Sequence, residues 1–436
     1  GNAIIVRKAW IDDGDVIHRE EVTIGVFLKE TNEQIDTVIL GENAMWYQIV
    51  GIGEHEADDV YILETHMEDM QVPLQQVYVD PSNPGAATPD YDNPEEPVLK
   101  TENGENYTTI QFAGPDHYYE ATYSMSTFAG YENVFTVTNR RLGIIDLTVT
   151  KTWVDGDNSE TKLLMDALAE NNLTLALYLK FDPDFVPEDN DYEINYEKNT
   201  ITLGNEVVDI RDNTGKKGTG KAILPITRDQ AVAGKTEYHF FNLPKYDLHG
   251  ASVRYTVEEV VVKLDGNGNV MGNAVTDSLS DYPYTDETTG KEYTLQELWN
   301  WYTRSYDKGE YVVAEKHERD THAMQVTNSL VGAKNVQWHK QWADRYAYET
   351  GVRPDIFLNI YAWTPDRPDA ENTPPRLVYE NYRWTPNEKY PGNDEYSWTV
   401  TIEDLPKYDA QGYEIFYYAT EHSNIDWAQL DYTEVQ

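Results

Sequence analysis

The pentapeptide VTKTW at residues 149–153 places a lysine where a β-strand buries its side chains. In an extended strand, Val149, Lys151 and Trp153 lie on one face and the two threonines on the other. The lysine is therefore expected to point into a protein core. Burial of an ammonium group is costly unless the group is paired or loses its proton, so this strand needs a polar partner in the same core.

The arrangement occurs twice more, in VRKAW near the start of the chain and in WHKQW in its last quarter. Such recurrence indicates an internal repeat, and 436 residues exceed the usual length of one domain. We therefore expect three domains, at residues 1–141, 142–331 and 332–436. The inward lysines of the two flanking repeats are Lys8 and Lys340.

Two later strands of the second repeat each carry one inward polar residue. In YTVEE, Glu259 shares a face with Tyr255 and Val257, and in HAMQVTN, Asn328 shares a face with Met324 and Val326. A lysine, a glutamate and an asparagine on strands of one domain suggest a common site. The second repeat thus offers the set Lys151, Glu259 and Asn328.

The other repeats contain parts of the same set. In the first repeat, VYILE supplies Glu64 and FTVTN supplies Asn139. In the Y-x-x-x-E spacing the glutamate lies four residues after a tyrosine, but Glu64 lies four residues after Val60 and only three after Tyr61. Glu64 is therefore assigned by strand parity, because it shares a face with Val60. In the third repeat, YYATE supplies Glu421, but no later stretch resembles VTN, so this domain is expected to lack its last strand.

Composition excludes several classes of protein. A net charge of −43 argues against nucleic acid as a partner, because phosphates would be repelled. The absence of cysteine excludes disulfides and thiolate metal sites. With 40% hydrophobic and 12% aromatic residues, the chain can form real cores. It has no transmembrane run or signal peptide, so no membrane insertion is expected in this segment, which we interpret as mature or trimmed.

Metal and enzyme motifs are weak. In HERDTH, His317 and His322 are one residue too far apart to share a helix face. DGNGN has Val270 where a calcium loop needs glycine. The acidic turns WIDDGD and WVDGDN could hold a cation, but such turns are more often solvated connections. With 77 acidic residues, paired carboxylates do not indicate a glycosidase. We expect no metal, no cofactor and no enzymatic activity beyond self-modification.

Insertions interrupt the strand pattern. SETKLLMDALAENN predicts a helix capped by Asn158 or Ser159, with Leu164, Met165 and Leu168 on one stripe. YTLQELWNWY predicts a second helix, since it has capping-box spacing. In the first repeat, VILGENAMWYQIVGI predicts a pair of hairpin strands, and a Pro-rich loop lies within residues 66–115.

These motifs resemble one family. VTKTWVDGDN, FFNLPKYD, YTVEE and VTN in the second repeat are similar to the B-type repeat domain of the Gram-positive collagen adhesin, which is found in surface adhesins and pilins. The third repeat shares SWTVTIEDLPKYDAQGYEI and YYATE. The first keeps VRKAW, WIDDGD and FTVTN but has GIGEHE where LPKYD would fall.

The resemblance implies an all-β chain of three tandem immunoglobulin-like β-sandwich domains of inverse topology, with short helical insertions. It also implies a spontaneous isopeptide bond between the first-strand lysine and the last-strand asparagine, assisted by the glutamate. The cross-linked pairs would be Lys8 with Asn139 and Lys151 with Asn328, and Lys340 would stay unpaired. The catalytic residues would be Glu64, Glu259 and Glu421. The alternative is a buried polar network without a covalent bond.

Two functions remain open at this point. The chain is either a stalk or pilin-like segment of a cell-surface adhesin, or a ligand-binding region. In the second case, an exposed aromatic platform in the insertions would bind host matrix protein or glycan. Both place the chain outside the cell, at the cell surface or cell wall, with neighbouring domains of the same protein as partners. The candidate ligand-binding residues are Trp299, Trp301, Tyr302 and Tyr306.

Overall fold

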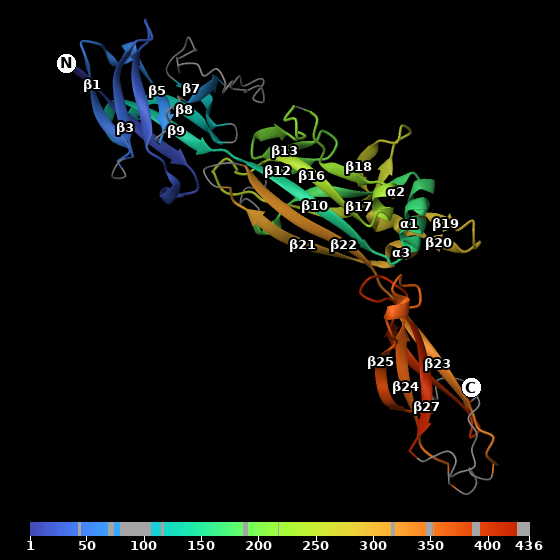
Figure 1. The fold of residues 1–436 in the computed structure, drawn as a ribbon. Coiled ribbons are helices and arrows are strands. Elements are labelled where there is room, and N and C mark those ends of the chain that lie inside the picture. The colour runs from blue at the N-terminus through green and yellow to red at the C-terminus, as the bar shows by residue number, and fades with distance from the viewer. Residues whose placement is uncertain are drawn as a thin grey trace.

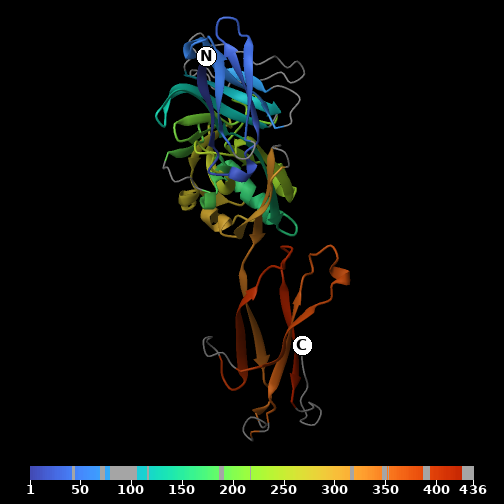
Figure 2. The ribbon, with the colours of Figure 1, turned by 90° about the vertical axis from the view of Figure 1, so that its left-hand side faces the viewer.

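The chain folds into three sandwiches that follow one another in a row (Figure 1). A view turned by a quarter shows the same order, with the first and third sandwiches at opposite ends (Figure 2). The prediction of an all-β chain with tandem immunoglobulin-like sandwiches and short helical insertions is confirmed. The computed structural model describes residues 1–41, 45–68, 74–78, 106–114, 117–185, 191–216, 218–314, 319–345, 351, 353–385 and 393–424.

The first sandwich packs a six-stranded sheet, in the order β4-β1-β9-β8-β7-β6, against a three-stranded sheet, β3-β2-β5. Its first strand, β1, pairs antiparallel with β4 and parallel with the last strand, β9. The strands are β1 (Asn2–Ile11), β2 (Val22–Leu28), β3 (Gln34–Leu40), β4 (Tyr47–Gly53), β5 (Val60–Met67), β6 (Gln75–Tyr78), β7 (Asn106–Gly114), β8 (His117–Phe128) and β9 (Tyr131–Arg141).

The second sandwich repeats this plan with sheets β16-β10-β22-β21 and β15-β11-β17-β18. Its first strand, β10, again pairs parallel with the last, β22. Short strands of the insertions form two small additional sheets, β12-β13-β14 and β19-β20. The main strands are β10 (Ile144–Val154), β11 (Leu173–Phe181), β15 (Ile223–Ile226), β16 (Lys235–Pro244), β17 (Tyr255–Leu264), β18 (Val270–Ala274), β21 (Tyr302–Val312) and β22 (Asp320–Leu330); the insertion strands are β12 (Tyr192–Asn195), β13 (Thr200–Leu203), β14 (Glu206–Asp209), β19 (Pro283–Thr285) and β20 (Glu292–Thr294).

The third sandwich is smaller. Its sheets are β23-β26 and β25-β24-β27. Within the described residues, β23 pairs only with β26, so the edge that β1 and β10 offer to a parallel last strand has no partner strand here. The strands are β23 (Ala333–Gln341), β24 (Ile356–Trp363), β25 (Arg376–Arg383), β26 (Ser397–Pro406) and β27 (Phe416–Ser423).

Alternating side chains build the second core. Along β10 the burial alternates strictly, with Leu147, Val149, Lys151 and Trp153 buried and the residues between them only partly covered. The pattern follows from the two-residue period of a strand with one face on a core. The predicted inward direction of Lys151 is therefore confirmed.

The structure has both of the helices that the sequence predicts. α1 (Ser159–Glu170) buries Leu164, Met165 and Leu168, and α3 (Leu295–Trp299) is capped by the Thr294 side chain. A third short helix, α2 (Arg228–Val232), was not predicted, although Thr227 and Gln230 form a capping box at its start. Short 3₁₀ turns are η1 (Val16–His18), η3 (Ala57–Asp59), η4 (Pro183–Phe185), η5 (Thr276–Asp281) and η7 (Ala370–Asn372). In the described part of the chain, none of the helices has the length and apolarity that a membrane crossing requires.

The predicted hairpin in the first repeat is wrong. β3 and β4 are strands, as expected, but β3 pairs with β2 in the small sheet and β4 pairs with β1 in the large one. β3 and β4 thus belong to different sheets, and both present an apolar face to the core between these sheets. Val38 and Leu40 of β3 meet Val50 and Ile52 of β4 across that core.

The joints between the sandwiches use the same contact twice. At the first joint, Gly250 packs against the backbone of Asp12. At the second, Gly412 packs against the backbone of Asp155. Both glycines close the LPKYD-containing loop, both have positive φ (72° and 83°), and a Cβ on either would lie 2.6 Å from a backbone oxygen of the preceding sandwich. A side chain at these positions is therefore excluded by contact as well as by conformation.

We predict that Gly412→Ala loosens the second joint without unfolding either neighbouring core. Gly268 is the matched control, since its φ of 78° is equally positive but a Cβ there meets nothing within 4 Å. Small-angle scattering should show a broader distribution of shapes for Gly412→Ala than for Gly268→Ala. Identical scattering from the two variants would contradict a role for the close approach.

Candidate functional site

The core of the first sandwich joins a lysine, a glutamate and an asparagine. Lys8 Nζ lies 2.6 Å from Glu64 Oε2, and Asn139 Nδ2 donates a hydrogen bond of 2.9 Å to Glu64 Oε1. The side chains of Lys8 and Glu64 are fully buried. Gln111 adds a weaker hydrogen bond of 3.3 Å to Glu64 Oε1. The glutamate thus bridges the first and last strands from the opposite sheet.

The second sandwich has the same set in the same arrangement. Lys151 Nζ lies 3.0 Å from Glu259 Oε2, and Asn328 Nδ2 donates a 2.7 Å hydrogen bond to Glu259 Oε1. Both side chains of the ion pair are again inaccessible to solvent. In the two sandwiches the asparagine Oδ1 is buried without a hydrogen-bond partner among the described residues. Each amide carbonyl is therefore left without a competing donor.

The strand register is the same in both sandwiches. Lys8 pairs with Val137 and Trp10 with Asn139 in the parallel ladder of β1 and β9. In the ladder of β10 and β22, Lys151 pairs with Val326 and Trp153 with Asn328. The asparagine thus lies two residues beyond the position opposite the lysine in each case. Independent burial of polar residues would not require this agreement.

Burial makes the two lysines easier to deprotonate. It lowers the pKa of Lys8 and of Lys151 from 10.5 to about 8, although the nearby glutamates act in the opposite direction. Each ammonium also lies over a tryptophan ring, 4.5 Å from the Trp10 centroid in the first sandwich and 4.1 Å from the Trp153 centroid in the second. Neutral amine is the nucleophilic form of lysine.

Burial alone would favour a protonated Glu259 carboxyl, but the groups around it oppose this. Burial acts to raise the pKa of Glu259, but the charges of Lys151 and Arg304 and the hydrogen bond from Asn328 outweigh it and hold the pKa below its ordinary value. The pair with Lys151 therefore begins as ammonium and carboxylate. Any proton on Glu259 has to come from the lysine beside it.

Sequence reasoning missed Arg304. Its guanidinium donates a 3.2 Å hydrogen bond to Glu259 Oε1 and lies 3.1 Å from the centroid of the Trp299 ring. Arg304 is paired with Asn328 across β21 and β22, where the first sandwich has Ala121 opposite Asn139. Strand parity could have found it, since it lies two residues from Tyr306 on the same face.

A tyrosine on the penultimate strand supports each glutamate. The Tyr123 hydroxyl accepts a 2.9 Å hydrogen bond from the backbone N–H of Glu64, and Tyr306 does the same for Glu259 at the same distance. Tyr123 is opposite Val137 and Tyr306 opposite Val326, so the two tyrosines occupy equivalent positions. Both were missed as supports of the site, because nothing in the local sequence marks a contact across the sandwich.

The third sandwich holds only part of the set. Lys340 Nζ lies 2.5 Å from Glu421 Oε1, and Lys340 lies over the Trp342 ring at 4.4 Å. The side chains of this pair are 12% and 16% exposed, in contrast to the inaccessible pairs of the other two cores. No asparagine from a parallel neighbour of β23 accompanies them within the described residues, which end at 424.

The expected aromatic platform is wrong for two of its four members. Trp299 and Tyr302 belong to the core of the second sandwich, at 9% and 4% exposure. Trp301 is partly buried against that core. Tyr306 is 41% exposed, but its hydroxyl is bonded to the backbone of Glu259. The aromatic residues of this insertion therefore pack and support the core and do not form a common exposed surface.

Only the second histidine of the HERDTH motif lies within the described residues. His322 is buried, and its Nε2 is hydrogen-bonded with the backbone oxygen of Lys308, while His317 lies outside the described residues. In DGNGN, the Asp265 carboxylate accepts from the backbone N–H groups of Asn267 and Asn269, as in an ordinary turn.

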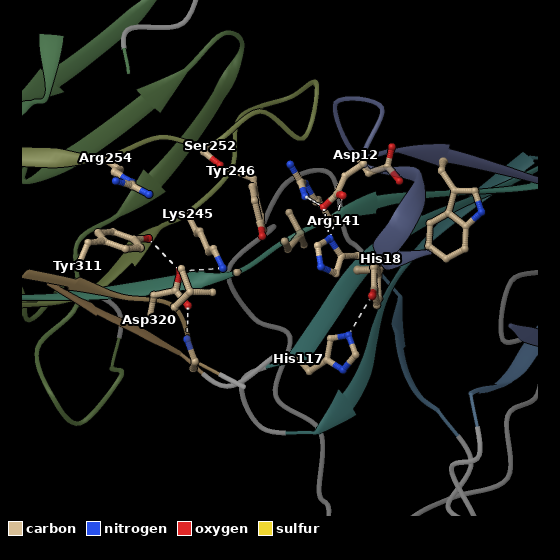
Figure 3. Close-up of a pocket in the computed structure, with 17 residues that line it drawn as sticks. Asp12, His18, His117, Arg141, Lys245, Tyr246, Ser252, Arg254, Tyr311 and Asp320 are labelled. Carbon is tan, nitrogen blue, oxygen red and sulfur yellow. Dashed lines mark hydrogen bonds and ion pairs between the residues drawn. The ribbon is translucent and has the colours of Figure 1, made fainter. Parts of the chain in front are cut away.

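A cavity of about 650 Å³ lies between the first and second sandwiches (Figure 3). Its charged groups are mostly paired with one another. Asp320 accepts from the Tyr311 hydroxyl at 2.9 Å and lies 2.7 Å from Lys245 Nζ, and Arg141 bonds Asp15 at 3.0 Å. The cavity is therefore part of the joint.

Comparisons with known families and with solved structures found the following similarities. Residues 215–278 match the Cna protein B-type domain. Among solved structures, two B repeat units of the collagen-binding protein Cna of Staphylococcus aureus align over 98% of this chain and 93% of theirs, at 15% identity and a TM-score of 0.18. The major pilin T-13 of Streptococcus pyogenes aligns over 76% of this chain and 97% of its own, at 12% identity and a TM-score of 0.17.

The C-terminal fragment of the pilus adhesin SpaC from Lactobacillus rhamnosus GG aligns over 76% of this chain and 99% of the fragment, at 8% identity and a TM-score of 0.19. A comparison with curated proteins found no match. The chain resembles the B-type repeat domains of Gram-positive collagen-adhesin-like surface proteins. The family match itself spans FFNLPKYD and YTVEE, two of the motifs that first indicated the resemblance.

We predict that uncross-linked protein becomes more stable as pH rises through the range in which Lys151 titrates. With a folded pKa of about 8 and an ordinary value of 10.5, the unfolded chain binds more protons than the folded chain between these limits. The free energy of unfolding of Asn328→Ala should therefore rise from about pH 8 to about pH 10.5 in denaturant titrations.

The matched control is Asn328→Ala combined with Lys151→Met, which lacks the titrating amine. Its stability should change less over the same range. Equal slopes for the two variants would show that the amine is not desolvated in the folded state.

Proposed function

We propose that the chain is a stalk or pilin-like segment of a cell-surface adhesin, and that an intramolecular isopeptide bond locks each of its first two sandwiches. The observation that carries the proposal is the repeated set of lysine, glutamate and asparagine at one register on the first and last strands. The bonds join Lys8 to Asn139 and Lys151 to Asn328.

The reaction begins with a proton transfer within the buried ion pair. Lys151 Nζ gives one proton to Glu259 Oε2, 3.0 Å away, and becomes a neutral amine. Two charges disappear from an apolar interior in this step, so burial acts in its favour, while the charge of Arg304 beside Glu259 acts against it. The supporting contacts from Tyr306 and Arg304 hold the glutamate in place meanwhile.

The amine then attacks Cγ of Asn328, and a new C–N bond forms. Glu259 passes its proton to Nδ2, to which it is already hydrogen-bonded at 2.7 Å, and takes a proton from Nζ. The Cγ–Nδ2 bond breaks and ammonia leaves. The products are a secondary amide, a neutral carboxylic acid and ammonia, so atoms and charge balance. Fixed positions in a closed core replace an external enzyme.

The position of the bond explains how such a segment would carry load. In each locked sandwich the bond joins the two parallel strands through which the chain enters and leaves the fold. Force applied to the ends of the sandwich passes through the covalent link and does not peel strands from the sheet. A rod of such units suits the shaft of a surface structure.

We propose domain boundaries at residues 1–141, 142–331 and 332–436, with Glu64 and Glu259 as the catalytic residues and Glu421 as their counterpart in the third sandwich. The chain would lie outside the cell at the cell wall, with neighbouring domains of the same protein as partners. A host matrix protein or glycan as ligand stays a prediction.

We predict that the intact protein is lighter than its sequence by two ammonia units, since each bond releases one ammonia of about 17 Da. Lys151→Ala or Glu259→Ala should each restore one unit and leave the first sandwich cross-linked. Electrospray mass spectrometry of the undigested chain measures this difference.

Glu258→Ala is the control, because Glu258 is the exposed neighbour of Glu259 on the same strand. It should keep both losses. A mass equal to the sequence mass for the unaltered chain would exclude the bonds and leave the two sets as hydrogen-bonded networks.

We predict that the second sandwich does not extend under force in the unaltered chain and extends fully in Lys151→Ala. A cross-link that closes a loop of about 100 residues or more contributes about 5 kcal/mol in the loop-entropy estimate, which rivals the net stability of a domain. Lys151→Ala should therefore also unfold at a lower temperature. Single-molecule stretching and calorimetry test the two expectations, and full extension of the unaltered second sandwich would refute them.

A further inference from the structure

Each sandwich has a buried aspartate two residues after the tryptophan that lies at or just after the end of its first strand. These aspartates are 5–8% exposed, so each carboxylate lies away from solvent at the end of the sandwich. A buried carboxylate needs a counter-charge. The three residues are Asp12, Asp155 and Asp344.

The first and third sandwiches supply that charge from an arginine. Arg19 binds both oxygens of Asp12, at 2.8 and 3.0 Å. Arg353 binds both oxygens of Asp344, at 2.8 and 2.7 Å. The same position in two of three repeats thus holds a carboxylate and a cation in two-point contact.

The second sandwich has no arginine at this position among the described residues. Asp155 Oδ2 accepts from the backbone N–H and the hydroxyl of Thr161, at 2.7 and 2.8 Å. Asp155 Oδ1 is buried and has no hydrogen-bond partner in the described part of the chain. One oxygen of the buried carboxylate is therefore uncompensated.

Two further carboxylates lie close to the carboxylate of Asp155. Asp155, Asp157 and Glu160 each bring one carboxylate oxygen into a group whose members lie within 4.8 Å of one another. Three acidic groups thus gather here, whereas Asp12 and Asp344 are each bound by an arginine.

We propose that Asp155, Asp157 and Glu160 bind a divalent cation of the calcium class, which takes the place that an arginine guanidinium fills in the first and third sandwiches. Carboxylate oxygens at such separations suit a hard cation. Calcium accommodates irregular oxygen sets better than magnesium, which demands a near-ideal octahedron.

The proposed ion lies at the second joint. Gly156, between two of the ligands, donates its backbone N–H to the carbonyl of Gly412 at 3.1 Å. A side chain at Gly156 would collide with the ring of Tyr413. The ligand loop is therefore also the surface on which the third sandwich docks, and an ion that orders the loop narrows the range of angles at this joint.

The site can be tested by isothermal titration of the chelator-treated full chain with calcium chloride. The solution contains 150 mM salt, which screens charges that are more than about one Debye length apart and so suppresses weak binding of calcium to the acidic surface. We expect one saturable site that is lost in Asp157→Asn/Glu160→Gln. It should persist in Asp277→Asn/Asp281→Asn, which removes two exposed acids of the same sandwich. No saturable site, or equal loss in both double variants, would overturn the proposal.

A second variant separates loss of binding from loss of folding. Asp157→Arg supplies a guanidinium near Asp155 and should fold, fail to bind calcium and melt at the same temperature with and without the ion. The unaltered chain should melt at a higher temperature with calcium than with chelator. A chain whose melting temperature ignores calcium, or an Asp157→Arg variant that still binds it, would contradict the assignment.

The effect on the joint can be measured directly, because the chain contains no cysteine. Spin labels at Lys263→Cys and Gln337→Cys, both exposed and in different sandwiches, report the distance distribution across the joint. Calcium should narrow this distribution, and the Asp157→Asn/Glu160→Gln background should abolish the narrowing. An unchanged distribution would refute the link between ion and joint.

Discussion

Each of the first two cores depends on the contacts that its buried glutamate makes with the lysine and the asparagine. A lysine ammonium placed between apolar neighbours would destabilise the sandwich if it were alone. Glu64 and Glu259 reach it from the opposite sheet and at the same time hold the asparagine of the last strand. One carboxylate therefore ties the first strand, the last strand and the facing sheet together, before any covalent bond forms.

Topology brings the lysine and the asparagine to the same relative position in each of these two cores. The first and last strands run parallel and adjacent, so a lysine on one and an asparagine on the other stay in one place relative to each other. The constraint also explains the difference of the third sandwich. Its Lys340 and Glu421 are paired, but β23 has one neighbour among the described strands, and the pair is partly accessible. Within the described residues, Lys340 and Glu421 form an ion pair and have no parallel last strand beside them.

Strand parity predicted much of the fold and the placement of the site. The two-residue period assigned Lys8, Lys151 and their partners to the interior, and it placed Glu64 correctly although the spacing from the nearest tyrosine is irregular. Parity works here because each strand has one face on a core, which leaves only two choices for a side chain.

Contacts across the sandwich could not be predicted in the same way. Arg304, Gln111 and the two supporting tyrosines act on the glutamates from strands whose pairing the local sequence does not specify. For the same reason, the sequence did not predict that β3 and β4 belong to different sheets. The aromatic insertion was misjudged because Trp299 and Tyr302 fill space beside the core, and a count of aromatic residues does not distinguish packing from exposure.

The most direct measurement is peptide mapping of the unaltered chain by tandem mass spectrometry after complete proteolysis. The account predicts a branched peptide in which the segment containing Lys151 is joined through its side chain to the segment containing Asn328, and a second branched peptide joining Lys8 and Asn139. Recovery of these four segments only as separate linear peptides, with both asparagines intact, would contradict it.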